Sequence, residues 1–332
     1  MRRQAVALPL KQPSLRISIG DALVPGAIAF EIESVAYFAA DRFWIRFAMG
    51  VAEFTSVAYF VKLGNQTITI DVTLNGFGFT NLLIGQIDNV RIDILANTAT
   101  LTGRDLSARL IDAESSETFV NHTASQIAEV IASRHQLTAN VTVTTTPVGQ
   151  YYELDHARST LGVNSRTTTE WNLLSSLAQV ENFELSVVGT VLNFGPPVLS
   201  MPVFVGPGSF IELTLDIATN LPGGTIVKSW NSRNKAVFSQ SEGTGLTTTI
   251  IRPNLTQVQV EQIAAGHLAV LSQHGTVLIG TMPADVAMVP GMQMSLAGTN
   301  SDLDQNYIIA KISRMLDARS GFVQTVRAYA IS

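Results

Sequence analysis

The sequence contains no cysteine and has few charged residues. Of its 332 residues, 21 are Lys or Arg and 26 are Asp or Glu, which is 14% of the chain, whereas soluble domains carry about 25%. The absence of cysteine excludes disulfides and Cys-ligated zinc or iron–sulfur sites. The formal net charge of −5, without basic clusters, argues against a nucleic-acid-binding surface. The apolar fraction of 46% excludes a disordered chain.

Long uncharged runs are present, but their composition argues against membrane spans. Residues 185–211 could cross a bilayer by length alone, yet this run contains four prolines and four glycines, which interrupt helical hydrogen bonding. The run 262–284 carries Gln and His in mid-span. Near the N-terminus, residues 5–10 are too short and include Pro9, unlike a signal peptide. We therefore expect a soluble chain without membrane insertion.

Most of the chain alternates apolar and polar residues with the period of a half-buried strand. Residues 15–19, 68–74, 211–217 and 292–296 show the pattern most regularly. Threonine, a good strand former, is abundant throughout. The sequence therefore predicts a β-dominated α+β protein.

Three or four helices interrupt the strands. Three of them are predicted by capping boxes, in which Thr is followed three residues later by Gln or Glu. These boxes are formed by Thr123 and Gln126, Thr167 and Glu170, and Thr256 and Gln259. Apolar residues at helical spacing favour a further helix over residues 51–62.

The order of predicted elements repeats along the chain and suggests three domains. Residues 1–103 contain strands 14–20, 27–37, 42–48, 66–74, 82–95 and 98–103 around helix 51–62. Residues 209–332 contain strands 209–217, 224–231, 235–240, 276–282, 291–297 and two within 306–331, around helix 257–274. Residues 1–103 follow the order β-β-β-α-β-β-β, and residues 209–332 follow the same order with one additional strand at the end. The intervening residues 104–208 are predicted to form a middle α+β domain with two helices and a hairpin over 183–194.

Sequence motifs for enzyme chemistry are absent. No H-E-x-x-H, G-x-S-x-G or phosphate-binding glycine loop occurs. Residues 76–78 resemble half of a dinucleotide loop, but Asn81 replaces the third glycine, which favours a turn between strands. Residues 300–304 resemble the start of a calcium loop, but Gln305 and Lys311 stand where glycine and glutamate are required. A solvated loop is the favoured interpretation.

The histidines offer no recognisable site either. They are His122, His135, His156, His267 and His274. His267 and His274 share a predicted helix, but a separation of seven residues is too large for joint chelation. Asp155 and His156 lack an identifiable nucleophile partner, so an ordinary surface pair is favoured. Trp171 and Trp230 are interpreted as core aromatics. We therefore predict no catalytic, cofactor-binding or metal-ligating residues and no enzymatic activity.

The middle of the chain carries a family resemblance. Residues 101–112, Leu-Thr-Gly-Arg-Asp-Leu-Ser-Ala-Arg-Leu-Ile-Asp, closely resemble the signature of the late-control protein D family, the baseplate hub proteins of tailed phages. Later segments resemble the family in the same order: 119–137, 170–178, 183–194, 289–292, 306–309 and 321–322. The resemblance covers residues from about 100 to 331, whereas residues 1–95 match only in strand order.

The resemblance implies a structural virion protein located in the tail baseplate and assembled in the host cytoplasm. Such hubs are homotrimers in which two tube-like β-barrel domains, here 1–103 and 209–332, each mimic a subunit of the hexameric tail tube. The implied partners are the tail tube protein above, a separate spike protein below, the tape measure protein and other baseplate proteins. DNA would pass through the ring during genome ejection without specific binding.

Two other functions stay open. The hub of a type VI secretion or tailocin-like contractile machine has the same implied architecture. A tail-associated cell-wall hydrolase or glycan-binding protein is less favoured, because no catalytic dyad is recognisable. The low charge fits a hub, since the chain has roughly 36 fewer charges than an average domain of its length. We expect these charges to be missing mainly from barrel faces that meet neighbouring chains, because interface centres are depleted in charge.

Overall fold

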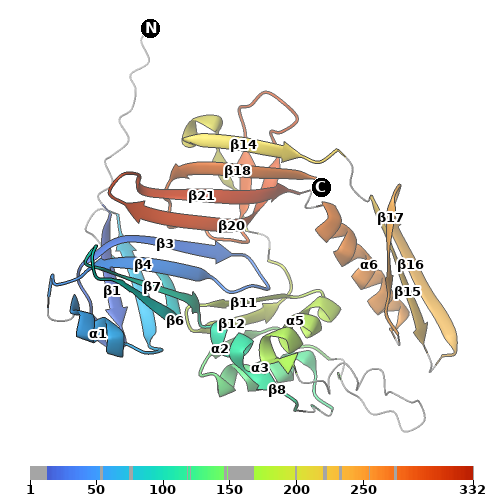
Figure 1. The fold of residues 1–332 in the computed structure, drawn as a ribbon. Helices are drawn as coiled ribbons and strands as arrows, with labels where there is room; N and C mark the ends of the chain where they lie inside the picture. The colour runs from blue at the N-terminus through green and yellow to red at the C-terminus, as the bar shows by residue number, and fades with distance from the viewer. Residues whose placement is uncertain are drawn as a thin grey trace.

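The computed structural model describes residues 13–52, 55–74, 78–117, 119, 121–145, 148, 168–198, 200–219, 223–231, 234–253, 255–272 and 275–331. Figure 1 shows a large sheet, a smaller α+β part beneath it, and a small sheet with one long helix at the far end. Within the described residues the protein is dominated by strands, which confirms the predicted β-dominated α+β class.

The large sheet contains 13 strands contributed by both ends of the chain. Its N-terminal strands are β1 (Ser14–Ile19), β2 (Ala22–Leu23), β3 (Ala27–Val35), β4 (Arg42–Ala48), β5 (Thr67–Thr73), β6 (Thr80–Asp93) and β7 (Thr98–Asp105). Its C-terminal strands are β13 (Val203–Val205), β14 (Glu212–Ile217), β18 (Thr276–Pro283), β19 (Gln293–Leu296), β20 (Asn306–Asp317) and β21 (Gly321–Ala330). The antiparallel pair β3–β20 joins the two groups side by side.

The order of the large sheet leaves two unpaired ends. The path runs β14-β18-β21-β20-β3-β4-β7-β6-β5-β1-β2, with β19 and β13 attached beside β20. Strand β14 lies at one end and β2 at the other, and among the described strands these ends do not pair with each other. The barrel form of the N-terminal and C-terminal parts therefore stays a prediction.

Two apolar cores lie against the large sheet. The N-terminal core is built by alternate residues of β1 and β3–β7, including Phe30, Ile45 and Phe47. Helix α1 (Val57–Lys62) adds Phe60, whose ring centre lies 5.6 Å from that of Phe47. Ser56 caps α1, which is shorter than the predicted helix 51–62. The C-terminal core gathers buried residues of β18–β21, with Tyr307 at its centre.

The described residues of the middle part form three helices and several short strands. They are α2 (Ala108–Asp112), α3 (Ala124–Arg134), α5 (Glu170–Glu181), β8 (Glu114–Ser115), β9 (Thr138–Val141), β10 (Thr168–Thr169), β11 (Glu184–Val188) and β12 (Val191–Gly195). The predicted capping box of Thr123 and Gln126 is confirmed. Helix α5 instead begins after Thr169, whose hydroxyl accepts from the N–H of Asn172, so the box predicted at Thr167 is wrong. The predicted hairpin is confirmed as β11–β12.

The small sheet consists of strands that sequence order had assigned to a second barrel. It contains β15 (Gly224–Asn231), β16 (Ala236–Gly243) and β17 (Thr247–Ile251), and it does not pair with the large sheet. Helix α6 (Gln257–Ser272) covers one face, and the box of Thr256 and Gln259 at its start is confirmed. A short 3₁₀ turn, η2 (Pro207–Ser209), precedes β14. Strand β17 was not predicted, so four strands rather than three precede α6.

The two tryptophans singled out from the sequence differ in burial. Trp171 is 5% exposed in the core of the middle part, as predicted. Trp230 is 53% exposed, so its interpretation as a core aromatic is wrong. On β15 the side chains of Ser229 and Asn231 are buried toward α6, and strand alternation turns Trp230 to the opposite face.

Candidate functional site

The segment that carries the family resemblance, residues 101–112, connects two cores. Leu101, in the middle of β7, is fully buried in the N-terminal core. Leu106 and Leu110 are buried in the core of the middle part. The chain therefore passes from one core to the next within five residues, and the polar residues between them decide how the two parts are held together. We refer to residues 101–112 with their polar partners as the junction.

The backbone around Gly103 is packed so closely that it leaves no room for a side chain at this position. A Cβ atom on this residue would lie 2.0 Å from the carbonyl oxygen of Gln86 and 2.6 Å from the ring of Phe43. Both neighbours belong to strands that pair with β7, so neither can withdraw without disturbing the sheet. The glycine of the signature is thus required by close packing of backbone and ring.

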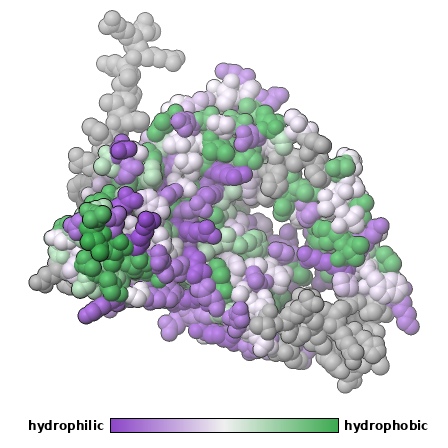
Figure 2. Space-filling model, viewed as in Figure 1, coloured by the Kyte–Doolittle hydropathy of each residue, from purple (hydrophilic) through white to green (hydrophobic). Residues whose placement is uncertain are grey.

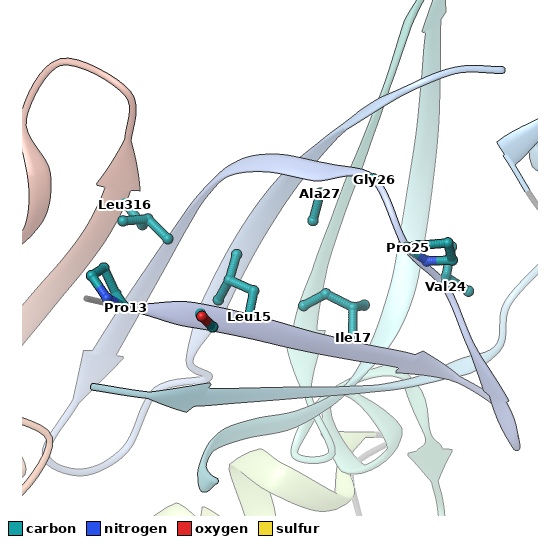
Figure 3. Close-up of a pocket in the computed structure, with 9 residues that line it drawn as sticks. Pro13, Leu15, Ile17, Val24, Pro25, Gly26, Ala27 and Leu316 are labelled. Carbon is teal, nitrogen blue, oxygen red and sulfur yellow. The ribbon is translucent and has the colours of Figure 1, made fainter. Parts of the chain in front are cut away.

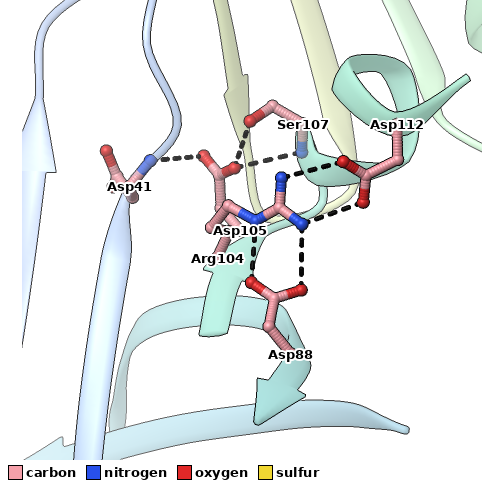
Figure 4. A network of polar contacts seen from close by, with 6 residues as sticks. All are labelled: Asp41, Asp88, Arg104, Asp105, Ser107 and Asp112. Carbon is pink, nitrogen blue, oxygen red and sulfur yellow. Dashed lines mark hydrogen bonds and ion pairs between the residues drawn. The ribbon is translucent and has the colours of Figure 1, made fainter. Parts of the chain in front are cut away.

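Arg104 binds two carboxylates at once (Figure 4). Its Nε and Nη2 donate to Asp88 on β6 at 2.7 and 3.0 Å. Its Nη1 and Nη2 donate to Asp112 on α2 at 3.0 and 2.8 Å. The hydrogen bonds to Asp88 and Asp112 raise the pKa of Arg104, which stays charged. This guanidinium therefore ties the large sheet to the first helix of the middle part.

The carboxylate of Asp105 contacts Asp41 and Ser107, and not the carboxylates that bind Arg104. It accepts hydrogen bonds from the backbone N–H of Asp41 at 3.2 Å, from the N–H of Ser107 at 3.0 Å, and from the hydroxyl of Ser107. Asp105 is 5% exposed, and this burial raises its pKa to about 7, with a further contribution from the charge of Asp41. Figure 4 shows the two carboxylates on either side of this contact.

Asp41 links the junction to the C-terminal part of the chain. Its carboxylate accepts from the N–H of Val35 at 2.9 Å. Burial raises the pKa of Asp41 to about 6, although the charge of Arg314 opposes the shift. Arg314 lies on β20, is 4% exposed and donates to the backbone oxygens of Asp285 and Met288. All three parts of the protein therefore meet around the carboxylates of Asp41 and Asp105.

Another buried carboxylate holds the middle part together. Glu170, at the start of α5, contacts Arg134 and His135 at the end of α3. Arg134 also pairs with the exposed Glu117 at 2.6 Å. The backbone oxygen of His135 accepts from Arg109 of the junction at 3.2 Å. His135 therefore takes part in the contacts that join α3, α5 and the junction.

The remaining sequence candidates that lie among the described residues do not gather into a site. His122 stacks edge-on against Phe119, and the ring of His267 contacts the hydroxyl of Thr225 at 3.1 Å. Residues 155–156, His274 and residues 76–77 lie outside the described residues. No group of three or more metal-ligating side chains occurs among the residues that the structure describes.

The acidic loop after β19 is closed by its own backbone. The carboxylate of Asp304 accepts from the N–H groups of Gly298, Thr299 and Asn300, and from the hydroxyl of Thr299. These bonds, that of the Thr299 hydroxyl above all, lower the pKa of Asp304. The loop therefore uses its carboxylate to stabilise a turn between strands, as the sequence favoured.

Two grooves lie on the N-terminal part. One, about 380 Å³ in volume, runs along the seam between β1 and β3, with Leu15, Ile17 and Leu316 among its lining residues (Figure 3). It has no titratable lining residue, so it offers no acid–base chemistry. The other, about 450 Å³, lies beside α1 and is lined by Val61, Val90 and Asp88 among others. None of the described helices is long and apolar enough to cross a membrane.

Comparisons with known proteins connect this architecture to tail proteins. No family model and no curated protein matches the sequence. The solved tail protein from Neisseria meningitidis MC58 is similar in structure, with a TM-score of 0.73, 14% identity and 96% of both chains covered. The 43 kDa tail protein of prophage MuSo2 from Shewanella oneidensis has a TM-score of 0.71 and 14% identity over 96% of this chain and 98% of the other.

A secretion protein has the same fold. An Escherichia coli component of the type VI secretion system, itself described as similar to phage T4 tail proteins gp27 and gp5, matches with a TM-score of 0.59 and 11% identity, over 95% of this chain and 77% of the other. The chain thus has the fold of phage tail and type VI secretion proteins. The fold therefore confirms the resemblance to phage tail proteins that residues 101–112 indicate.

Proposed function

We propose that this chain is a structural protein of a phage tail, the hub of the baseplate that joins the tail tube to the central spike. The observation that carries the proposal is the fold likeness to two phage tail proteins over 96% of the chain. The signature at residues 101–112 supports the hub in particular, because it resembles hub proteins rather than tail proteins in general.

The proposed hub is a homotrimer with six tube-like units. The N-terminal and C-terminal parts would each imitate one tube subunit, and three chains would then match a sixfold tube. The pairing of β3 with β20 supports this proposal, because it sets the two parts edge to edge within one chain. The spike would bind the opposite side of the ring as a separate polypeptide.

The composition agrees with a protein that is largely covered in its assembly. Large apolar side chains such as Leu95, Phe204 and Ile251 are exposed on the isolated chain, and obligate interfaces bury on the order of 2,000–5,000 Å². The net charge of −5 suits a conduit through which DNA passes without binding. The proposed location is the tail baseplate of the virion, after assembly in the host cytoplasm.

A second candidate is the hub of a type VI secretion or tailocin-like machine. The fold likeness to the Escherichia coli secretion component favours it specifically. Neighbouring genes distinguish the phage hub from the secretion hub. Capsid and terminase genes indicate a phage, whereas a gene for an ATPase that recycles the sheath indicates a secretion machine. In both cases the proposed role is mechanical and not enzymatic. Clearing of peptidoglycan in a zymogram would instead support a cell-wall hydrolase.

Electron microscopy of the purified chain, alone and mixed with its spike and tube proteins, tests the proposal. We expect a ring with threefold symmetry and pseudo-sixfold outline, in contact with tube on one side and spike on the other. Antibody labelling of intact particles should mark the tail tip. A chain that stays monomeric in the presence of both partners contradicts the proposal.

A further inference from the structure

Two exposed apolar surfaces lie at opposite ends of the chain. One is at the end that carries α1, and the other is on the small sheet β15–β17 at the far end (Figure 1). Figure 2 shows hydrophobic side chains gathered at the α1 end. Exposed apolar patches of this kind mark places where other protein binds.

The sheet surface comprises Lys228, Trp230, Val237 and Ile251. Trp230 lies directly opposite Val237, and Lys228 lies opposite Ile251. Trp230, Val237 and Ile251 are 53%, 62% and 77% exposed, while α6 covers the other face of the same sheet. Lys228 forms no ion pair with any residue that the structure describes. The open face of this sheet therefore presents three exposed apolar side chains beside one cation, as a surface covered by other protein would.

The helix surface comprises Val51, Val57, Val61 and Leu95. Helix α1 buries Phe60 and exposes Val57 and Val61, the latter to 69%. Leu95, fully exposed, is in the turn between β6 and β7, which is held beside residues 49–50 by hydrogen bonds between Asn97 and Met49. These bonds hold the turn of Leu95 beside the segment that carries Val51 and precedes α1 in the chain.

The two surfaces complement each other in shape and charge. The groove of about 450 Å³ beside α1 is lined by Val61, Val90 and Ile92, which is suitable for an indole ring such as that of Trp230. Asp88, at the same groove, and Asp112 share the single positive charge of Arg104, so this cluster keeps one net negative charge that Lys228 can meet. A contact of the sheet surface with itself would instead bring two Lys228 side chains together. The occupant that fits each surface is therefore the other surface of a second copy.

We propose that the helix surface of one copy binds the sheet surface of the next copy, head to tail. This inference rests on the proposed hub and names the surfaces through which its copies meet. Contacts between two different surfaces generate a closed ring when the rotation from each copy to the next brings the last copy into contact with the first. Trp230, exposed on the isolated chain, would become the aromatic anchor of each contact.

The natural absence of cysteine permits a clean cross-linking test. Ala58→Cys is on the exposed face of α1, and Ser239→Cys is on the sheet surface opposite Lys228. With a short bismaleimide, we expect a covalent dimer when the two single variants are mixed and none from either variant alone. The double variant should give cross-linked trimers. Asp302→Cys, in the exposed loop after β19, replaces either partner as the control and should give no product.

A second substitution tests the anchor. Trp230→Lys in the Ser239→Cys background should lower the yield of mixed dimer at least tenfold, whereas Val188→Lys, on an exposed strand end outside both surfaces, should leave it unchanged. Homodimers of Ser239→Cys, or equal yields with the Asp302→Cys control, overturn the inference. If a threefold ring still forms in either case, the hub function stands and only the surfaces are wrong. If no ring forms with spike and tube, the hub function itself fails.

Discussion

The carboxylate of Asp105 accepts a hydrogen bond from the backbone N–H of Asp41, a residue 64 positions earlier in the chain. Asp41 follows β3, which pairs with β20, and Asp105 ends β7, which leads into the middle part. The contact therefore lies where all three parts meet. Because two like charges lie close together with little solvent, the stability of this contact depends on whether the carboxylates are protonated.

Stability is expected to fall as the pH rises through the pKa values of these two groups. Burial raises the pKa of Asp41 to about 6 and that of Asp105 to about 7, whereas unfolded Asp titrates near about 3.9. Between these values the folded chain binds more protons than the unfolded chain. The contribution of Asp41 and Asp105 to the free energy of unfolding is therefore fully present below about pH 4 and is lost as the pH rises through about 6–7. Urea unfolding at pH 5 and pH 8 measures the effect.

Asp105→Asn should reduce that pH dependence, because it removes one of the two coupled charges. We expect the difference in the free energy of unfolding between pH 5 and pH 8 to be clearly smaller in this variant. Asp302→Asn, in an exposed loop, is the matched control and should behave as the native chain does. An unchanged slope in Asp105→Asn would show that other groups cause the pH dependence.

Replacing Arg104 should loosen the contact between the large sheet and the middle part. Arg104→Met removes four hydrogen bonds to Asp88 and Asp112. Because all three side chains are partly exposed, we expect a loss of about 1 kcal/mol in unfolding free energy. Arg91→Met, an exposed strand position without a described ion pair, should change stability by less than about 0.5 kcal/mol. Denaturant titration distinguishes the two.

Gly103→Ala should be strongly destabilising although it adds one methyl group. The new Cβ would overlap the carbonyl oxygen of Gln86 and the ring of Phe43, and overpacking of this kind costs about 1–3 kcal/mol. Gly208→Ala, where no atom lies within 4 Å of the added Cβ, should be nearly neutral. Equal melting temperatures for the two variants would contradict the close packing at the junction.

Glu170→Gln should destabilise the middle part, because it leaves Arg134 and His135 without their buried carboxylate. The expected loss is about 1–3 kcal/mol, as for a buried group deprived of its partner. Glu117→Gln, whose side chain is 45% exposed, removes the other partner of Arg134 and should cost less. Thermal unfolding followed by circular dichroism compares both variants with the native chain.

Elements that depend on nearby residues were predictable. The alternation in residues 68–74 predicted β5, and Thr123 with Gln126 predicted the start of α3, because strand period and capping are local properties. The short strand β17 was missed, because its pairing with β15 is parallel and joins segments that are distant in sequence. Trp230 was misjudged because which face of β15 is covered depends on the position of α6.

The junction was predictable as a motif but not as a site. Residues 101–112 carried the family resemblance, yet their roles depend on partners far away in sequence. Nothing in the local pattern indicates that Arg104 meets Asp88, or that Asp105 meets Asp41. Charged side chains reveal their function only when folding sets their burial and their neighbours.

The sequence alone determined a β-dominated chain with capped helices, no cysteine chemistry, no recognisable enzyme motif and an unusually uncharged composition. These properties follow from residue type and local spacing. Only the tertiary structure decided that β3 and β20 join the two ends of the chain, that β15–β17 form a sheet of their own, and that buried carboxylates gather at the junction. Strand partners and burial arise from contacts between distant segments, which no local pattern specifies.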